Sequence, residues 1–204
     1  MKGKAKPHIV IFVEGDTDEI FFNSLISFYK ANSVTEVASC EVVNLRGVAR
    51  YSGKVTGKLR NEICPKAEKR SMYVKAVCCS YDTDVFEFAE RPVVDWKKVK
   101  KIIHDMGIRI FHQIEVRSMI EDWLLNDLSG ICNFLKIEKP NSTPGKTGFE
   151  KIQNLYKKAN RVYLKGRDVS KLMPYLCFQT IRDKRKEYLS TLEDLLNVKI
   201  ETMK

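Results

Sequence analysis

Apolar and polar positions alternate along the first two thirds of the chain in a way that predicts strands followed by helices. Four short apolar runs have the length and the β-branched content of buried strands, at residues 8–13, 38–44, 73–80 and 108–114. Apolar residues then recur at helical spacing in four further segments, at residues 18–30, 48–64, 94–106 and 117–126, and Pro65 is expected to end the second of them. Strands that alternate with helices are typical of a parallel sheet covered on both faces. We therefore predict an α/β fold with a mostly parallel sheet of about four strands.

The last third of the chain has a different pattern, with helical periodicity and no further strand. A loop is expected at residues 140–148 and a long helix at 179–197. We predict an α/β core over residues 1–130 and a helical extension over residues 131–204, packed together as one structural domain. No apolar run approaches the ~20 residues that a membrane-spanning helix needs.

Charge narrows the range of functions. The chain has 36 Lys and Arg against 26 Asp and Glu, a net charge of +10, yet its acids gather in the blocks 11–20, 81–90 and 121–130. A basic protein with localised acids suggests a polyanionic substrate and divalent cations where the chemistry occurs, although basic helix faces are often merely solvated. The six cysteines form no CxxC pair, which argues against structural zinc and fits reduced thiols in the cytoplasm.

The first acidic block directly follows the first predicted strand. Glu14 is the last residue of that apolar strand, and Gly15 lets the backbone turn sharply behind it. Carboxylates at the carboxyl end of a parallel strand lie where open α/β sheets bind their ligands. We expect Glu14 to point over this edge, and Asp16 and Glu19 to act as capping residues for the following helix.

The other two acidic blocks are expected near the same edge. Asp82 and Asp84 follow the third strand as Asp-Thr-Asp, a spacing that lets both carboxylates bind one cation. In the third block, Glu121 and Asp122 stand beside Trp123. We expect Glu121 to face the site and Trp123 to lie in the core, while a solvated position for both acids remains open.

These motifs together resemble the Toprim domain of topoisomerases, primases and OLD-type nucleases. The resemblance rests on VEGDTDE after one strand and DTD after another, and IEDWLLND is similar to a segment of small stand-alone OLD-like proteins. It covers roughly residues 8–125. It implies that Glu14 is a metal ligand and an acid or base, that Asp82 and Asp84 bind Mg²⁺, and that Asp18 matches a further acid of OLD-like nucleases.

The chemistry expected from this set is hydrolysis of a phosphodiester. One or two Mg²⁺ or Mn²⁺ ions would be held by carboxylates and would activate a water molecule. The expected metal ligands are Glu14, Asp18, Asp82, Asp84 and Glu121. Lys165 is the expected catalytic cation, with an exposed basic loop as the alternative. The expected nucleic-acid contacts are Arg46, Arg50, Lys54, Lys58 and Arg167.

The sequence therefore favours a cytoplasmic, metal-dependent nuclease that acts on DNA or RNA, with phage defence as one setting. The competing hypothesis is a non-catalytic, nucleic-acid-binding or regulatory Toprim protein that works in a complex. A third, a hydrolase or phosphotransferase of small nucleotides, requires a closed pocket. A second copy of the chain or a defence-complex partner is expected, and a membrane is not.

Overall fold

The computed structural model describes residues 5–87 and 93–201 and has a single sheet at its centre. The sheet consists of four parallel strands in the order β2-β1-β3-β4. Their bounds are β1 Lys6–Val13, β2 Ser39–Asn44, β3 Met72–Asp82 and β4 Ile110–Val116. The predicted α/β class and its parallel sheet are confirmed.

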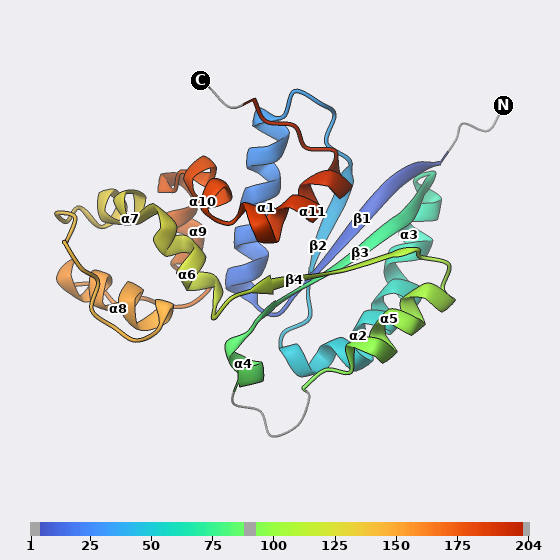
Figure 1. The fold of residues 1–204 in the computed structure, drawn as a ribbon, viewed down its shortest axis with the longest axis horizontal. Helices are drawn as coiled ribbons and strands as arrows, with labels where there is room; N and C mark the ends of the chain where they lie inside the picture. The colour runs from blue at the N-terminus through green and yellow to red at the C-terminus, as the bar shows by residue number, and fades with distance from the viewer. Residues whose placement is uncertain (1–4, 88–92, 202–204) are drawn as a thin grey trace.

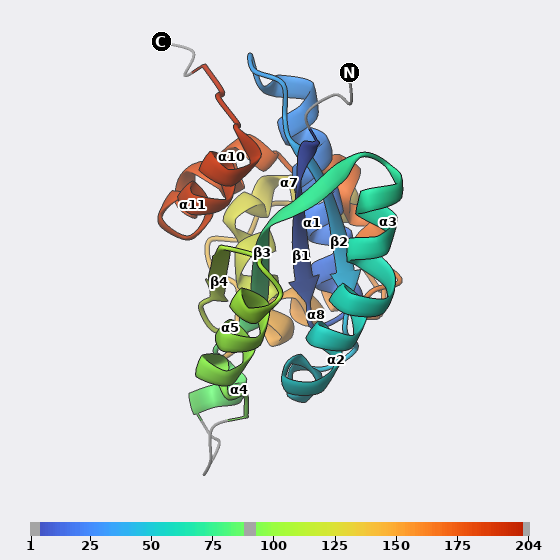
Figure 2. The ribbon, with the colours of Figure 1, turned by 90° about the vertical axis from the view of Figure 1, so that its right-hand side faces the viewer.

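Helices cover both faces of the sheet (Figures 1 and 2). One face carries α2 Tyr51–Lys58, α3 Cys64–Lys69 and α5 Trp96–Asp105. The other face carries α1 Asp16–Asn32 and the C-terminal helices. Successive β1 residues alternate between the two layers: Ile9 and Ile11 face α1, and Val10 and Phe12 face α2 and α5. This explains why β1 is a continuous apolar run rather than an alternating one.

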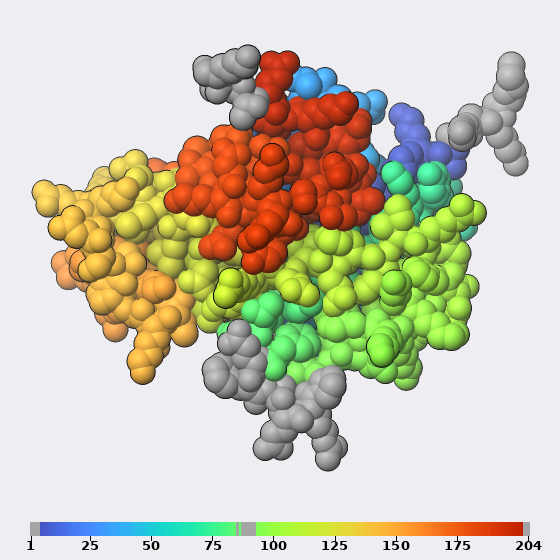
Figure 3. Space-filling view, in the orientation of Figure 1, coloured from blue at the N-terminus to red at the C-terminus, as the bar shows by residue number. Residues whose placement is uncertain are grey.

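Of the remaining helices, α4 lies between β3 and α5 in the chain, and the others follow β4. Their bounds are α4 Asp84–Glu87, α6 Ile120–Leu124, α7 Leu128–Leu135, α8 Gly148–Lys158, α9 Val169–Leu172, α10 Phe178–Lys184 and α11 Lys186–Leu196. The C-terminal helices share one hydrophobic cluster with α1 and the strands, and Trp123 is buried in it as expected. Figure 3 shows α10 and α11, in orange and red, across the upper centre of the molecule.

Two helix predictions were wrong in their extent. The helix predicted over 48–64 passes through a π-turn at Leu59–Ile63 and continues as α3 beyond Pro65. Proline is accommodated there because it stands in the first turn of α3, where its missing N–H is not needed. The single helix predicted over 179–197 is broken at Arg185, whose backbone leaves the helical region between α10 and α11.

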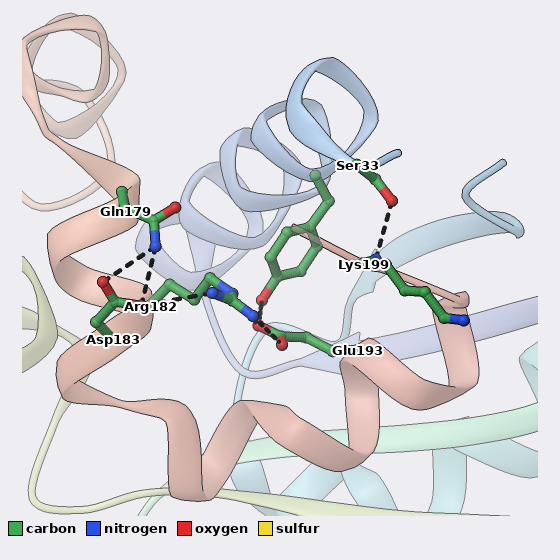
Figure 4. Close-up of polar contacts among 7 residues, drawn as sticks. Ser33, Gln179, Arg182, Asp183, Glu193 and Lys199 are labelled. Atoms are coloured by element: carbon green, nitrogen blue, oxygen red, sulfur yellow. Dashed lines mark hydrogen bonds and ion pairs between the residues drawn. The ribbon is translucent and has the colours of Figure 1, made fainter. Parts of the chain in front are cut away.

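A buried ion pair joins α10 and α11 to α1 (Figure 4). Arg182 Nε donates to Glu193 Oε1 at 2.7 Å, and Arg182 Nη2 donates to Glu193 Oε2 at 2.8 Å. The Tyr29 hydroxyl donates to Glu193 Oε1 at 2.9 Å. Both carboxylate oxygens of Glu193 are therefore bonded inside the protein.

The described part of the chain, residues 5–87 and 93–201, contains no helix long and apolar enough to cross a membrane.

Candidate active site at the carboxyl ends of the strands

The loop after β1 brings two strand ends together. Glu14 Oε1 accepts a hydrogen bond from the backbone N–H of Asp82, at the end of β3, over 2.9 Å. The carbonyl oxygen of Glu14 accepts the N–H of Gly47, just after β2, at 2.7 Å. Gly15 then precedes the first residue of α1 in an extended conformation. Glu14 is consequently fixed between its two neighbouring strands, at the edge where its position after the apolar run placed it.

Asp82 and Asp84 stand on either side of the turn out of β3. Asp82 is the last residue of β3 and Asp84 the first of α4. Thr83 ties this turn to the end of β4, because its hydroxyl accepts the N–H of Ser118 at 2.8 Å. One oxygen of each aspartate, Oδ1, is buried and has no hydrogen-bond partner. The two aspartates thus each supply a carboxylate oxygen that accepts no hydrogen bond from residues 5–87 and 93–201.

The third acidic block contributes Glu121, which is fully buried in α6. Its Oε1 lies 3.3 Å from Lys165 Nζ and accepts the Tyr163 hydroxyl at 3.3 Å, whereas its Oε2 has no partner. Asp122 points elsewhere, with its Oδ1 4.0 Å from Lys151 Nζ. The structure therefore brings Glu121 and Lys165 together and separates Asp122 from them.

Lys165 reaches this place because its loop is docked on the amino end of α1. The N–H of Gly166 donates to Thr17 Oγ1 at 3.1 Å. Gly166 has φ +74°, and an added Cβ would lie 3.0 Å from Asp16 Cβ, so glycine suits both the backbone and the close approach. The Lys165 ammonium also lies 5.1 Å from the centre of the Phe149 ring. The C-terminal region thereby places a cation at the acidic edge of the sheet.

These segments enclose a pocket of about 250 Å³. It is lined by Glu14, Asp16, Asp18, Asp82 and Lys165, together with Gly15, Thr17, Gly47, Ile120 and Gly166. A pocket of about 550 Å³ lies near Tyr73 at the amino end of β3, but one of its two acids, Asp105, is already paired with Lys101 at 2.8 Å. In the first pocket, acids and a cation converge from three separate chain segments: residues 14–18, Asp82 and Lys165.

Burial and mutual repulsion disfavour charge on the clustered acids. Burial raises the pKa of Glu14 to about 8, and repulsion from Asp18 and Asp84 adds to this effect. The pKa of Asp18 is raised by burial and then by Glu121. The pKa of Asp82 is raised by burial and then by Asp18 and Glu14. Such a cluster is stable when its carboxyls hold protons or share a cation.

The donor set suits a hard divalent cation. Four buried carboxylate oxygens have no partner, and oxygen ligands of this kind are those that Mg²⁺ and Mn²⁺ prefer; they belong to Asp18, Asp82, Asp84 and Glu121. Within residues 5–87 and 93–201, however, no three His, Cys, Asp or Glu side chains already form a metal-binding group. Glu14 and Glu121 are held instead by Asp82 N–H, Lys165 and Tyr163. Binding a cation would require some of these side chains to move.

The basic residues singled out from the sequence divide into two sets. Arg46, next to pocket-lining Gly47, and Arg167, next to Gly166, are exposed beside the pocket. The second set, Arg50, Lys54 and Lys58, lies just before α2 or within it and does not line the pocket. Arg50 Nη1 donates to the Leu45 carbonyl at 3.4 Å. Lys54 is exposed, and Lys58 pairs with Glu62 at 3.2 Å.

Several residues of the site were missed or misjudged from the sequence. Asp16 and Glu19 were expected to cap α1, but its N-cap is Gly15 without a side-chain hydrogen bond. Both acids instead accept from Asn44 Nδ2, at 2.7 and 3.1 Å. An asparagine at the carboxyl end of β2 was the available signal. Tyr163 donates to Glu121, but nothing in the sequence around Tyr163 indicated that it lies at the site.

Comparison with known proteins gives similarities of fold at low sequence identity. No protein-family model and no curated protein matches the chain. The C-terminal region of the OLD protein of Xanthomonas campestris pv. campestris is 14% identical, with a TM-score of 0.45, over 93% of this chain and 96% of that one. The C-terminal region of the Burkholderia pseudomallei OLD protein is 15% identical, with a TM-score of 0.44, over 92% of this chain and 98% of that one.

Proposed function

We propose that this protein is a metal-dependent nuclease of the Toprim type, OLD-like, that hydrolyses phosphodiester bonds in DNA or RNA. The observation that carries the proposal is the convergence of Glu14, Asp18, Asp82 and Lys165 on one pocket. Buried carboxylate oxygens without partners attract a divalent cation, and the net charge of +10 suits a polyanionic substrate. The proposed setting is the cytoplasm, in phage defence.

The proposed roles follow from what each side chain can do. Mg²⁺ or Mn²⁺, when bound, would neutralise the scissile phosphate and activate water. Asp18, Asp82 and Asp84 offer the unpartnered oxygens for that ion. Glu14 has one oxygen, Oε1, fixed by Asp82 N–H, which leaves Oε2 to take or give a proton.

Proton transfer suits Glu14 because burial raises its pKa, to about 8 in the cation-free protein. Lys165 is half-exposed at the rim of the pocket and adds positive charge where the phosphate oxygens would become more negative. Arg46 and Arg167, each next to a glycine that lines the pocket, are proposed to hold the flanking phosphates.

The test is cleavage of plasmid DNA and of labelled single strands of DNA and RNA with Mg²⁺ or Mn²⁺. We expect Glu14→Gln and Asp82→Asn each to lower the rate by about 10²- to 10³-fold, since each removes a group worth several kcal/mol in the transition state. Asp194→Asn, at an exposed position of α11, is the matched control and should cut like the wild type. Equal rates in all four proteins would overturn the proposal.

A non-catalytic role in a nucleic-acid complex is the second candidate. It is favoured by the finding that no three ligand side chains in the described ranges are already arranged around a metal position. In that case the chain would bind nucleic acid with a second copy or a defence-complex partner. Binding that Glu14→Gln and Asp82→Asn leave unchanged, with no cleavage by the wild type, would support this role and exclude the nuclease.

A further inference from the structure

We propose that the exposed lysines of α5 and the aromatic side chains beside Asp82 and Asp84 form a second part of the nucleic-acid interface, which holds a single strand as it leaves the pocket. This inference rests on the proposed function, because it takes nucleic acid as the ligand of the pocket. It adds a surface that the sequence motifs do not mark.

The lysines occupy the solvent side of α5. Val99 and Ile103 are buried and Trp96 is partly buried, whereas the other face carries Lys97, Lys98, Lys100 and Lys101. Lys101 pairs with Asp105 at 2.8 Å, but Lys97, Lys98 and Lys100 form no ion pair with the side chains that the structure describes, which exclude those of residues 85 and 87. Four exposed ammonium groups lie within two helical turns, and three of them have no acidic partner among the described side chains. Such a row of positive charge suits the consecutive phosphates of a strand.

An aromatic cluster connects this helix to the acidic pocket. Tyr81, which directly precedes Asp82, stacks on Trp96 with ring centres 4.8 Å apart and an interplanar angle of 29°. Phe86, two residues after Asp84, lies 5.1 Å from Tyr81 and 6.5 Å from Trp96. The Asp-Thr-Asp turn is therefore bracketed by aromatic rings that reach the first turn of α5.

The outer members of this cluster are accessible. Tyr81 is buried, whereas Phe86 and Trp96 are each only partly buried. A partly exposed ring next to a phosphate-binding helix is the combination by which proteins hold single strands, because an unpaired base stacks on the ring while lysines contact the backbone. A duplex keeps its bases paired and offers no such face.

The α5 lysines also extend a basic surface already identified. Helices α2 and α5 lie side by side on the same face of the sheet, and α2 carries Lys54 and Lys58 (Figures 1 and 2). In Figure 3 the yellow-green segment that includes α5 forms the lower right of the visible face, below the C-terminal helices. A strand that leaves the pocket past Phe86 would thus cross positive charge on both helices.

Binding is measured separately from cleavage, by fluorescence anisotropy of a labelled single strand of about 20 nucleotides. EDTA is present so that no divalent cation supports cleavage. We expect Lys97→Ser/Lys100→Ser to weaken binding about tenfold at 0.1 M salt, and to lower the slope of log Kd against log salt by ~1–2, as the loss of two phosphate contacts requires. Lys157→Ser/Lys158→Ser, on α8 at the other end of the molecule, removes the same charge and should change Kd less than twofold (Figure 1).

Stacking is tested by Phe86→Leu, which keeps an apolar side chain but removes the ring. We expect at least fivefold weaker binding of the single strand, and no change for a hairpin duplex of equal length. Wild-type affinity in the lysine variant, or an equal loss in the α8 control, would overturn the α5 surface. Equal effects of Phe86→Leu on strand and duplex would overturn the single-strand preference.

The two proposals fail in different ways. A wild-type protein that binds as expected but never cleaves removes the nuclease and leaves the α5 surface in place. A protein that cleaves, with α5 variants that bind and cut like the wild type, removes the surface and leaves the nuclease. If the wild type bound neither the single strand nor the hairpin duplex, the proposal that α5 contacts nucleic acid would be wrong.

Discussion

Two of the regions that bury acidic side chains differ in how those side chains are bonded. Glu193, between α10, α11 and α1, has both oxygens bonded, to Arg182 and to Tyr29. At the carboxyl ends of the strands, Asp82 and Glu121 each keep one oxygen without a partner. A buried carboxylate whose partners are complete holds the fold together, whereas one that lacks partners needs a proton or an added cation.

Arg182→Met should lower the stability of the fold more than any other substitution considered. The substitution leaves Glu193 buried without its cation, so the free energy of unfolding should fall by about 3–5 kcal/mol in urea titrations. The double variant Arg182→Met/Glu193→Leu removes both charges and should recover most of this loss. If the single and double variants were equally unstable, the pair would contribute through packing alone, and the contrast with the acidic pocket would disappear.

A second substitution examines the other region, at Lys165. Its side chain is 52% exposed and its ion pair with Glu121 is solvated on one side, so Lys165→Met should change the free energy of unfolding by less than ~1 kcal/mol. Cleavage with Mg²⁺ should nevertheless fall about 10- to 100-fold, because the cation at the pocket is lost.

Lys171→Met, an exposed lysine on α9, is the matched control and should leave both quantities unchanged. Lys165→Arg should restore part of the cleavage rate, because it keeps the charge with a different geometry. A large loss of stability in Lys165→Met would place this lysine with Arg182 among the residues that hold the fold.

The sequence was sufficient to predict the sheet and one half of the site. Apolar runs mark the four strands, and position after a strand end identifies Glu14 and Asp82 as neighbours at one edge. These predictions succeed because strand burial and strand ends are local properties of the chain.

The other half of the site depends on contacts between distant parts of the chain. Thr17 and Gly166 are 149 residues apart, and Tyr163 and Glu121 are 42 apart. Lys165 was suggested by a neighbouring glycine, but its partner in α6 could not be derived, since no periodicity relates a loop after α8 to the amino end of α1. The same reason explains why the break at Arg185 was missed: that residue reaches across to the Asp122 carbonyl at 3.3 Å.

The smallest expected effect is on the pH dependence of the free energy of unfolding. It is tested with Asp18→Asn in the absence of a divalent cation. Burial raises the pKa of Asp18 above its ordinary value of 3.8, and burial raises that of Glu14 from 4.5 to about 8. The unfolded chain releases these protons near pH 4, whereas the folded protein retains them. The stability of the cation-free protein should therefore decline as pH rises from about 4 to 8.

Asp18→Asn removes one of these titrating groups, so its free energy of unfolding should decline less between pH 5 and pH 8 than that of the wild type. We expect a difference of about 1–2 kcal/mol in urea titrations in EDTA, since removal of one buried charge is worth about that much. Mg²⁺ should raise the Tm of the wild type more at pH 8 than at pH 5, because at the higher pH the cation replaces protons that have already left. Glu193→Gln should leave that Mg²⁺ response unchanged, because the Glu193 carboxylate has both oxygens occupied by Arg182 and Tyr29. An equal decline in the free energies of unfolding of Asp18→Asn and of the wild type between pH 5 and pH 8 would contradict this expectation. That result would show that Asp18 does not hold a proton in the folded protein, and the contrast with Glu193 would fail.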